Sequence, residues 1–217
     1  SLERANPRMK SKSKRGAKGI VSALNVSPPD AVNVGEHDLV FGLDNLLELA
    51  DAARFELISA NLAKADGSRP FEGHVVVERG GKKVAFVGIL KPTPRIDDYY
   101  ERRDLEVGEP FRAYQREMGA LPEDVDLVVL ASNLGIKDTQ DLIRRLDSND
   151  VRIDAAVVSN SNSLTRSPKW ERGVPLVEPL SRGKYYGRLD VLLGPEPGIE
   201  FANPSEPLEE MYRNYVS

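Results

Sequence analysis

The chain has no cysteine, a single tryptophan and only two histidines, His37 and His74. The absence of cysteine excludes disulfide bonds, thiolate metal ligands and cysteine nucleophiles, while it says little about the cellular compartment. No apolar run approaches the roughly 20 residues that a membrane-spanning helix needs, and the first residues lack the charged-then-apolar layout of a signal peptide. The composition therefore predicts a soluble chain without a membrane-spanning segment.

Length and charge predict one globular domain with a basic extension. A chain of 217 residues, 40% of them hydrophobic, is long enough for one large or two small domains, and we favour one. The net charge is -4, yet residues 1–19 carry seven Lys or Arg against one Glu, so the remainder is strongly acidic. We therefore divide the chain into a basic N-terminal arm at residues 1–15 and a single domain at residues 16–217.

Two roles are open for the basic arm. Clustered cations attract phosphate groups, whereas charge runs are usually solvated surface segments. No aromatic residue stands among these cations to stack on a base, and the acidic remainder argues against a dedicated nucleic-acid surface. We expect a solvated arm and no nucleic-acid partner.

Residues 31–61 combine a strand, a polar turn, a helix and a second strand. A short apolar run ends at Gly35, which lets the backbone turn before three ionisable residues, Glu36, His37 and Asp38. Apolar residues then recur at helical spacing, and a second apolar run follows. Polar side chains at the carboxyl end of a strand, directly before a helix, lie where open α/β folds tend to place their sites.

The rest of the chain alternates apolar runs with amphipathic stretches. Gly80 and Gly81 separate two β-rich runs and allow positive φ at both turn positions, so they predict a hairpin. A helix from about Lys14 to Leu24 precedes the central unit, and Ser205 is placed as the N-cap of a last helix. Further strands are expected at 125–131, 153–158, 174–178 and 185–193, with helices around Phe111 and Leu142. The alternation indicates an α/β protein with an antiparallel section near its end.

The central unit resembles the GNHE or GNHD block of the calcineurin-like metallophosphoesterases, specifically of their 5′-nucleotidase branch. The residues in register with that block are Gly35, His37, Asp38 and Gly42, and the unit ends in ISAN at 58–61, close to the LSAN of the family. The resemblance covers roughly residues 16–194. It implies the α/β sandwich of that family, in which two mixed β-sheets are flanked by helices.

Two further blocks of the family can be located, and their metal-binding histidines are replaced. The family block SHLG reads SNLG at 132–135, so Asn133 stands where the family has histidine. The block GHSH reads SNSN at 159–162, so Asn160 and Asn162 replace two more histidines. The resemblance therefore predicts a degenerate metal site.

The family block at the 35–38 turn retains some of its functional residues. Glu36 takes the place of the metal-bridging Asn of the family, while His37 and Asp38 are retained. By resemblance, His37 lies beside the scissile phosphate as an acid or transition-state stabiliser, with Asp38 as its neighbour. From the residues alone, the same pair is more often structural, because no serine motif for a catalytic triad accompanies it. His74, within an apolar run, is expected to be structural.

The first two blocks of the family, Asp-x-His and Gly-Asp, do not occur in the sequence. Either the chain begins after them, so that the fold lacks its first strands, or the protein never had them. We also expect no support for nucleotide specificity, because the C-terminal domain that clamps the nucleoside in 5′-nucleotidases is not part of residues 1–217.

The replaced residues change which metals fit. Members of the family use two divalent ions to activate water and neutralise charge on the phosphoryl group. An amide is a weak oxygen ligand, suited to Mg²⁺ or Ca²⁺ and poor for Zn²⁺ or Mn²⁺ compared with imidazole. We therefore expect either no cofactor or one hard divalent cation held by the oxygens of Glu36, Asn133, Asn160 and Asn162.

Two functions follow from these residues. The first is a degenerate 5′-nucleotidase-like domain that has lost the two-metal chemistry and binds a protein partner or a small phosphorylated ligand. The second is an active metal-dependent phosphoester hydrolase with an oxygen-rich metal site and His37 as its acid. A fold does not decide between them. Many members of this branch are exported, so the resemblance favours an exported or periplasmic protein.

Overall fold

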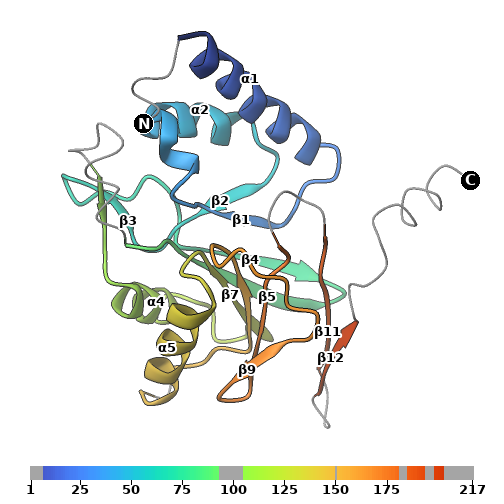
Figure 1. Cartoon of the computed structure of the whole chain (residues 1–217). Helices are drawn as coiled ribbons and strands as arrows, with labels where there is room; N and C mark the ends of the chain where they lie inside the picture. Colours follow the sequence, from blue (N-terminus) through green and yellow to red (C-terminus); the bar gives the residue numbers. More distant parts are fainter. Residues whose placement is uncertain (1–6, 93–104, 150, 181–184, 194–197, 203–217) are drawn as a thin grey trace, which may run out of the picture.

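A six-stranded mixed sheet forms the centre of the computed structural model, which describes residues 7–92, 105–149, 151–180, 185–193 and 198–202 (Figure 1). The strands lie in the order β4-β5-β7-β8-β10-β9. Their bounds are β4 His74–Arg79, β5 Lys82–Ile89, β7 Leu127–Ser132, β8 Ala155–Val158, β10 Val174–Val177 and β9 Lys169–Glu171. The four inner strands are parallel to one another, and the edge strands β4 and β9 are antiparallel to their neighbours. The carboxyl ends of the four parallel strands therefore lie next to one another, at the same end of the sheet.

Two helices, α4 (Pro110–Met118) and α5 (Ile136–Asp147), cover one face of this sheet (Figure 1). Successive side chains of a strand point to opposite faces, so Ala85, Val87 and Ile89 of β5 share one face. They belong to a buried cluster with Tyr114 of α4, and residues of α5 join the same cluster. This cluster is the main hydrophobic core.

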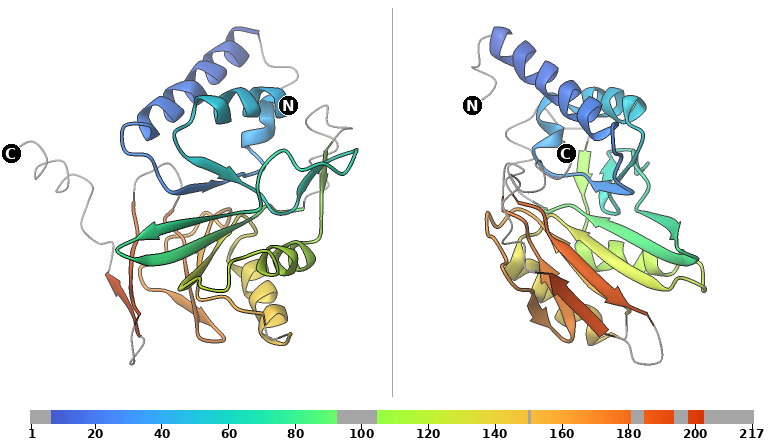
Figure 2. Two further views of the ribbon diagram at one scale, coloured as in Figure 1. Left: turned by 180° about the vertical axis from the view of Figure 1, so that it is seen from behind. Right: turned by 90° about the vertical axis from the view of Figure 1, so that its right-hand side faces the viewer.

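A smaller layer lies on the other side of the sheet. The strands β1 (Ala31–Asn33) and β2 (Glu56–Ile58) form a parallel pair, which lies between the sheet and the helices α1 (Pro7–Leu24) and α2 (Leu43–Ala52) (Figures 1 and 2). A short 3-10 helix, η2 (Asp38–Phe41), joins β1 to α2. Leu39 of η2 is fully buried in a second apolar cluster.

Two antiparallel pairs complete the described elements. The first joins β3 (Leu62–Lys64) to β6 (Leu105–Val107), and the second joins β11 (Arg188–Leu192) to β12 (Gly198–Ala202). β11 lies near β8 and β10, since Leu189 lines a common cavity with Val157 and Val177. Among the residues described, no helix is both long and apolar enough to span a bilayer.

The predicted architecture, an α/β protein with mixed sheets and flanking helices, is confirmed. The predicted hairpin is also present, because Gly80 and Gly81 have φ values of 58° and 73° and connect β4 to β5. The strands β3, β6, β9 and β12 and the helix η2 were not predicted. The strands at 62–64, 105–107 and 169–171 are only three residues long and carry little period-two pattern.

Helix α1 begins at Pro7 and not at about Lys14, so the helix starts earlier than its apolar spacing indicates. Two cations of the basic segment contact the body of the molecule. Nζ of Lys14 lies 5.7 Å from the ring centre of Phe41, and Nζ of Lys18 lies 3.9 Å from a carboxylate oxygen of Glu48. The division into residues 1–15 and 16–217 stays a prediction, although α1 continues across it. The helix predicted after Ser205 lies outside the described residues.

Candidate functional site

Three segments that are far apart in the sequence meet where β1, β5, β7 and β8 end. The carbonyl oxygen of Ile89 accepts two hydrogen bonds, from Nδ2 of Asn33 at 3.0 Å and from the N–H of Asn133 at 2.9 Å. The N–H of Ser159 donates to the carbonyl of Ser132 at 2.8 Å. The 35–38 turn, the 133–135 loop and the 159–162 loop therefore lie side by side, as expected for segments that follow neighbouring parallel strands.

One carboxylate holds the 35–38 turn together. The N–H of Gly35 donates to Oδ2 of Asp38 at 2.7 Å, and the N–H of Asp38 donates to the carbonyl of Gly35 at 3.1 Å. Gly35 is not among the residues with positive φ, so the turn does not depend on a left-handed backbone there. A Cβ at this position would lie 3.3 Å from Nδ2 of Asn133. The close approach of the turn to the end of β7 therefore favours glycine here, because a β-carbon would press on the Asn133 side chain.

Desolvation raises the pKa of the Asp38 carboxyl above its ordinary value, against the lowering effects of the Gly35 N–H and of His37. The residue as a whole is exposed, so water limits the size of this effect. Because its carboxylate already accepts the Gly35 N–H, Asp38 stabilises the turn in the first place, and any role toward a ligand comes second.

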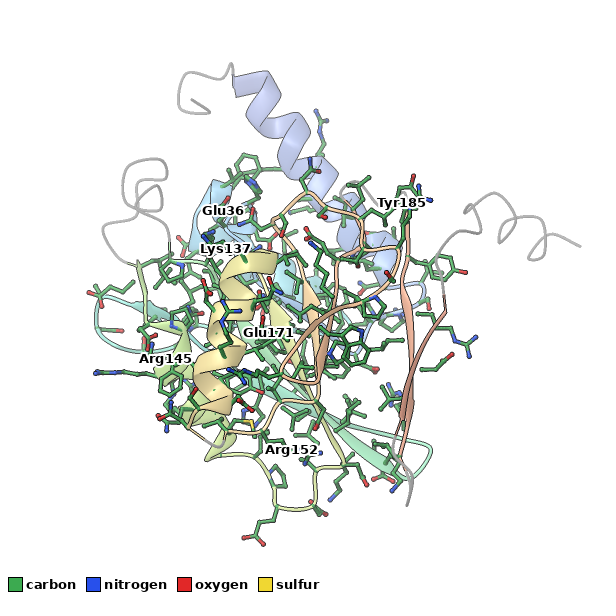
Figure 3. The ribbon with its side chains drawn as sticks, turned by 60° about the horizontal axis from the view of Figure 1, so that its bottom comes forward. Glu36, Lys137, Arg145, Arg152, Glu171 and Tyr185 are labelled. Carbon is green, nitrogen blue, oxygen red and sulfur yellow. The ribbon has the colours of Figure 1, made fainter. Side chains whose placement is uncertain are left out.

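His37 and Glu36 differ in how they face the solvent. The side chain of His37 is 83% exposed, whereas that of Glu36 is 21% exposed, and Nε2 of His37 lies 3.7 Å from Oε1 of Glu36. Figure 3 labels Glu36 and also Lys137, which lies in the first turn of α5. The imidazole is thus accessible to a ligand from the solvent side, while the Glu36 side chain is mostly shielded from solvent.

The asparagines of the two loops tie the strand ends to one another. Nδ2 of Asn133 donates to Oγ of Ser159 at 3.2 Å, and Nδ2 of Asn160 donates to the carbonyl of Asn133 at 3.2 Å. Asn160 and Asn162 have φ values of 79° and 51°, a left-handed conformation that Asn adopts more readily than most residues. The amide oxygen of Asn133 is buried and has no hydrogen-bond partner among the described residues.

Sequence reasoning missed Asn33. Its Oδ1 is also buried without a hydrogen-bond partner among the described residues, and a Cβ at Gly88 would lie 2.6 Å from it. A polar residue inside the apolar run AVNV was the signal that identifies it. Asn33 and Asn133 thus both donate to the Ile89 carbonyl, and the side-chain oxygen of each is buried without a hydrogen-bond partner among the described residues.

Glu178 was missed as well. It is only 4% exposed, and its Oε1 accepts the N–H of Ser161 at 2.8 Å. Oγ of Ser161 in turn accepts the N–H of Ile136, the first residue of α5, at 2.6 Å. A charged residue at the end of the apolar run VPLVE was the signal in the sequence. Glu178 therefore holds the 159–162 loop in place through its hydrogen bond with Ser161.

The structural role predicted for His74 is confirmed. Its Nδ1 lies 2.8 Å from Oε2 of Glu117, whose buried carboxylate also binds Arg69 and Arg116. Burial alone would raise the pKa of Glu117, but hydrogen bonds from His74 and Arg116 and the charge of Arg69 outweigh it, and the pKa is lowered. This cluster joins β4 to α4.

The side chains at the strand ends do not fit a dinuclear zinc or manganese centre. The sequence has two histidines, of which His74 is bound to Glu117 and His37 is largely exposed. In the part of the chain that the structure describes, no three His, Cys, Asp or Glu residues are grouped so as to hold a metal ion. The oxygens that are present, the Glu36 carboxylate and the unpaired amide oxygens, suit one hard cation such as Mg²⁺ or Ca²⁺.

Comparison with known proteins gives no match to a family model. The chain is 25% identical over 178 residues to the uncharacterized metallophosphoesterase YunD of Bacillus subtilis, a match that covers 80% of this chain and 37% of that protein. It is 26% identical over 147 residues to an apyrase of Tabanus yao, covering 64% of this chain and 25% of the apyrase. The chain thus spans roughly a third or less of the length of these relatives.

Solved structures show the same fold. A 5′-nucleotidase precursor from Thermus thermophilus superposes with a TM-score of 0.74 at 20% identity, covering 94% of this chain and 45% of that one. The calcineurin-like phosphoesterase YfkN from Bacillus subtilis gives a TM-score of 0.70 at 20% identity, covering 95% of this chain and 78% of that one. The fold is that of a calcineurin-like phosphoesterase. The homologues and structural neighbours of this chain are calcineurin-like metallophosphoesterases and 5′-nucleotidases.

Proposed function

We propose that this chain is a phosphoesterase-type domain that binds a phosphorylated ligand at the strand ends without hydrolysing it. One observation carries the proposal. The positions that the resemblance assigns to metal-binding imidazoles hold amides, and the Asn133 and Asn160 amides donate hydrogen bonds to neighbouring loop atoms. Imidazoles at these positions are what a two-metal centre of zinc or manganese would require.

Several groups around the site suit a phosphate. His37 and Lys137 are exposed next to the strand ends, and the N-terminal end of α5 favours negative charge. Glu36 and Asp38 oppose an anion at the same place. A hard divalent cation between Glu36 and the phosphate removes this repulsion, so the proposal expects Mg²⁺ or Ca²⁺ to strengthen binding.

Binding and hydrolysis are separated by two measurements. Calorimetry with a nucleoside monophosphate, with and without Mg²⁺, is expected to show binding that Mg²⁺ strengthens in the wild type and not in Glu36→Ala. Hydrolysis of an aryl phosphate in Mn²⁺, Mg²⁺, Ca²⁺ or Zn²⁺ is expected to stay at the level of the metal alone. Turnover that falls in His37→Ala would contradict the non-catalytic reading.

The second candidate is a phosphoester hydrolase that works with one hard cation. The two unpaired amide oxygens of Asn33 and Asn133 favour it, because a buried acceptor without a donor is unusual unless a cation or water completes it. In this case Glu36 and the amides hold the ion and His37 is the acid. Elemental analysis of the purified protein, combined with the aryl phosphate assay, decides between the two candidates. The hydrolase is established if the wild type holds stoichiometric metal, Glu36→Ala loses that metal, and the wild type turns over the aryl phosphate.

We propose that the protein is exported, because the names of some of its relatives describe exported proteins. One solved neighbour is described as a 5′-nucleotidase precursor, and two curated relatives are venom 5′-nucleotidases. Fractionation of the source cells with an antibody to this chain tests the location, and a signal confined to the cytosol would refute it.

A further inference from the structure

The strand β9, at one side of the central sheet, has an open edge. It pairs with β10, and its other edge meets no strand among the described residues (Figure 1). Its middle residue is Trp170, the only tryptophan of the chain, which is 53% exposed. Proteins usually protect such an edge, because its unpaired backbone groups can bind another strand. β9 therefore presents a backbone edge and a large apolar side chain at the same place.

The backbone groups of Trp170 point toward this open edge. Trp170 lies opposite Pro175 of β10, and proline has no N–H, so the two residues cannot exchange a pair of hydrogen bonds. The two-residue turn at 172–173 agrees with this, because the residues that close such a hairpin, Glu171 and Val174, form a hydrogen-bonded pair. Hydrogen-bonded and non-hydrogen-bonded pairs alternate along an antiparallel ladder. The N–H and the carbonyl of Trp170 are therefore directed away from β10.

The side chains of β9 are divided between the two faces of the sheet. Oε2 of Glu171 accepts a hydrogen bond from Arg144 of α5 at 2.6 Å, so Glu171 lies on the face that the helices cover. Lys169, two residues earlier, shares this face, whereas Trp170 lies on the opposite one. The sequence Lys-Trp-Glu therefore carries one positive and one negative charge at equal distances from Trp170.

This order of charges makes the edge complementary to itself. If two copies of β9 run antiparallel and are centred on Trp170, Lys169 of each copy lies opposite Glu171 of the other. These residues form non-hydrogen-bonded pairs, in which side chains approach most closely, and opposite charges in such pairs stabilise a sheet. A second copy of this chain thus matches the open edge in both hydrogen bonding and charge.

We propose that two copies of this chain form a dimer by pairing their β9 strands antiparallel about Trp170. The two Trp170 residues exchange N–H to carbonyl hydrogen bonds, and their rings pack against each other on one face of the joined sheet. Two pairs of Lys169 with Glu171 form on the other face. Since each copy contributes a strand of three residues, the dimer belongs to the weak, transient class of interfaces. The proposal does not depend on the function proposed for the strand ends.

Because Trp170 is the only tryptophan, its fluorescence reports on the dimer without a label. Sedimentation velocity of the full chain over a series of concentrations is expected to show monomers that convert to dimers. Over the same concentrations, the emission of Trp170 is expected to move to shorter wavelength, because its ring leaves water. A monomer at every concentration, or a dimer whose formation leaves the emission unchanged, would refute the proposal.

Charge reversal tests the pairing itself. Lys169→Glu places two carboxylates opposite each other in both pairs, so it is expected to weaken dimerisation about tenfold. Glu171→Lys is expected to weaken it as well, by placing two cations together. When the two variants are mixed in equal amounts, opposite charges face each other again, and a heterodimer of about wild-type affinity is expected. A mixture that associates no better than either variant alone would overturn the proposed register.

Arg54→Glu is the matched control. It makes the same change of charge as Lys169→Glu, at an exposed residue between α2 and β2, and is expected to leave dimerisation unchanged. If it weakens the dimer as much as Lys169→Glu, net charge explains the effect and the pairing is refuted. Glu171→Lys also loses the bond to Arg144, so thermal unfolding followed by circular dichroism checks its fold. Lys169 is exposed, and Lys169→Glu alone still tests the edge if Glu171→Lys unfolds.

Discussion

Single residues decide how closely the two layers approach each other. At Gly88 a Cβ would lie 2.6 Å from Oδ1 of Asn33 and 2.9 Å from the backbone carbonyl of Ile58. Backbone atoms of a paired strand move little, so the contact with Ile58 has no easy relief. Glycine at this position lets the β1 layer lie directly on β5.

Gly88→Ala is expected to destabilise the protein by about 1–3 kcal/mol, the usual range for overpacking. Gly19→Ala is the matched control, because Gly19 is exposed in α1 and a Cβ there meets nothing within 4 Å. The control is expected to stabilise by up to about 1 kcal/mol, since alanine favours a helix over glycine. Urea unfolding measures both, and an unchanged midpoint for Gly88→Ala would contradict the packing argument.

The buried Glu117 predicts how stability depends on pH. Its pKa in the folded state lies below the ordinary value of 4.5. Such a carboxyl contributes stability above its unfolded pKa, and this contribution is lost as the pH falls through the lower, folded pKa. In Glu117→Gln the ionised group is absent, so the free energy of unfolding is expected to drop by roughly 2 kcal/mol near neutral pH.

The same substitution removes one contribution to acid unfolding. Wild type and Glu117→Gln should therefore converge as the pH falls below about 4.5, where the Glu117 advantage disappears. Chemical unfolding at several pH values measures the difference. A gap between the two proteins that stays constant down to strongly acid pH would show that Glu117 does not titrate as proposed.

At the scale of single elements, helix α4 depends on its cap. The carboxylate of Glu109 accepts the N–H groups of Phe111 and Arg112 at 3.2 and 2.9 Å, and Pro110 begins the helix. Arg145 of α5 pairs with the same carboxylate at 2.7 Å. Glu109 thus both starts α4 and joins it to α5.

Glu109→Ala is expected to destabilise by about 1 kcal/mol, the usual loss for an N-cap. Glu106→Ala, three residues earlier on the exposed side of β6, removes the same charge without a cap and is expected to stay within about 0.5 kcal/mol of wild type. Thermal unfolding compares them, and equal shifts would attribute the effect to charge alone.

How much the sequence predicted also depends on the element. Strands and helices with a strong period, such as β5, β7 and α5, were predicted within a few residues because burial on both faces or along one stripe leaves a clear pattern. β3, β6 and β9 have three residues each, and tertiary pairing decides them. Asn133, Asn160 and Asn162 were assigned to the site by resemblance to the family blocks, whereas the contacts of Asn33 and Glu178 depend on register across strands, which a sequence motif does not reveal.

At the scale of the whole molecule, the elements differ in how they are supported. The strands β5 and β7 pair on both sides and face a helical layer, whereas the described residues of β11 and β12 pair only with each other. Strands held from both sides open only with the whole domain, while a two-stranded pair opens more easily.

Hydrogen exchange followed by mass spectrometry is expected to reflect this difference. Amides of β5 and β7 should exchange at the slowest rate in the protein, close to that of global unfolding, and those of β11 should exchange much faster. Equal rates in β7 and β11 without ligand would mean that the domain opens as a single unit.

The carbonyl of Ile89, which accepts hydrogen bonds from both Asn33 and Asn133, has a thermodynamic consequence. A carbonyl oxygen has two acceptor positions, and both are occupied by groups that lead to different loops. The 159–162 loop is joined to this junction through Asn133, which contacts Ser159 and Asn160. A cation bound at the 35–38 turn and an anion bound at the 159–162 loop would therefore both act on it. By linkage, whatever factor the cation adds to the affinity for the anion, the anion must add to the affinity for the cation.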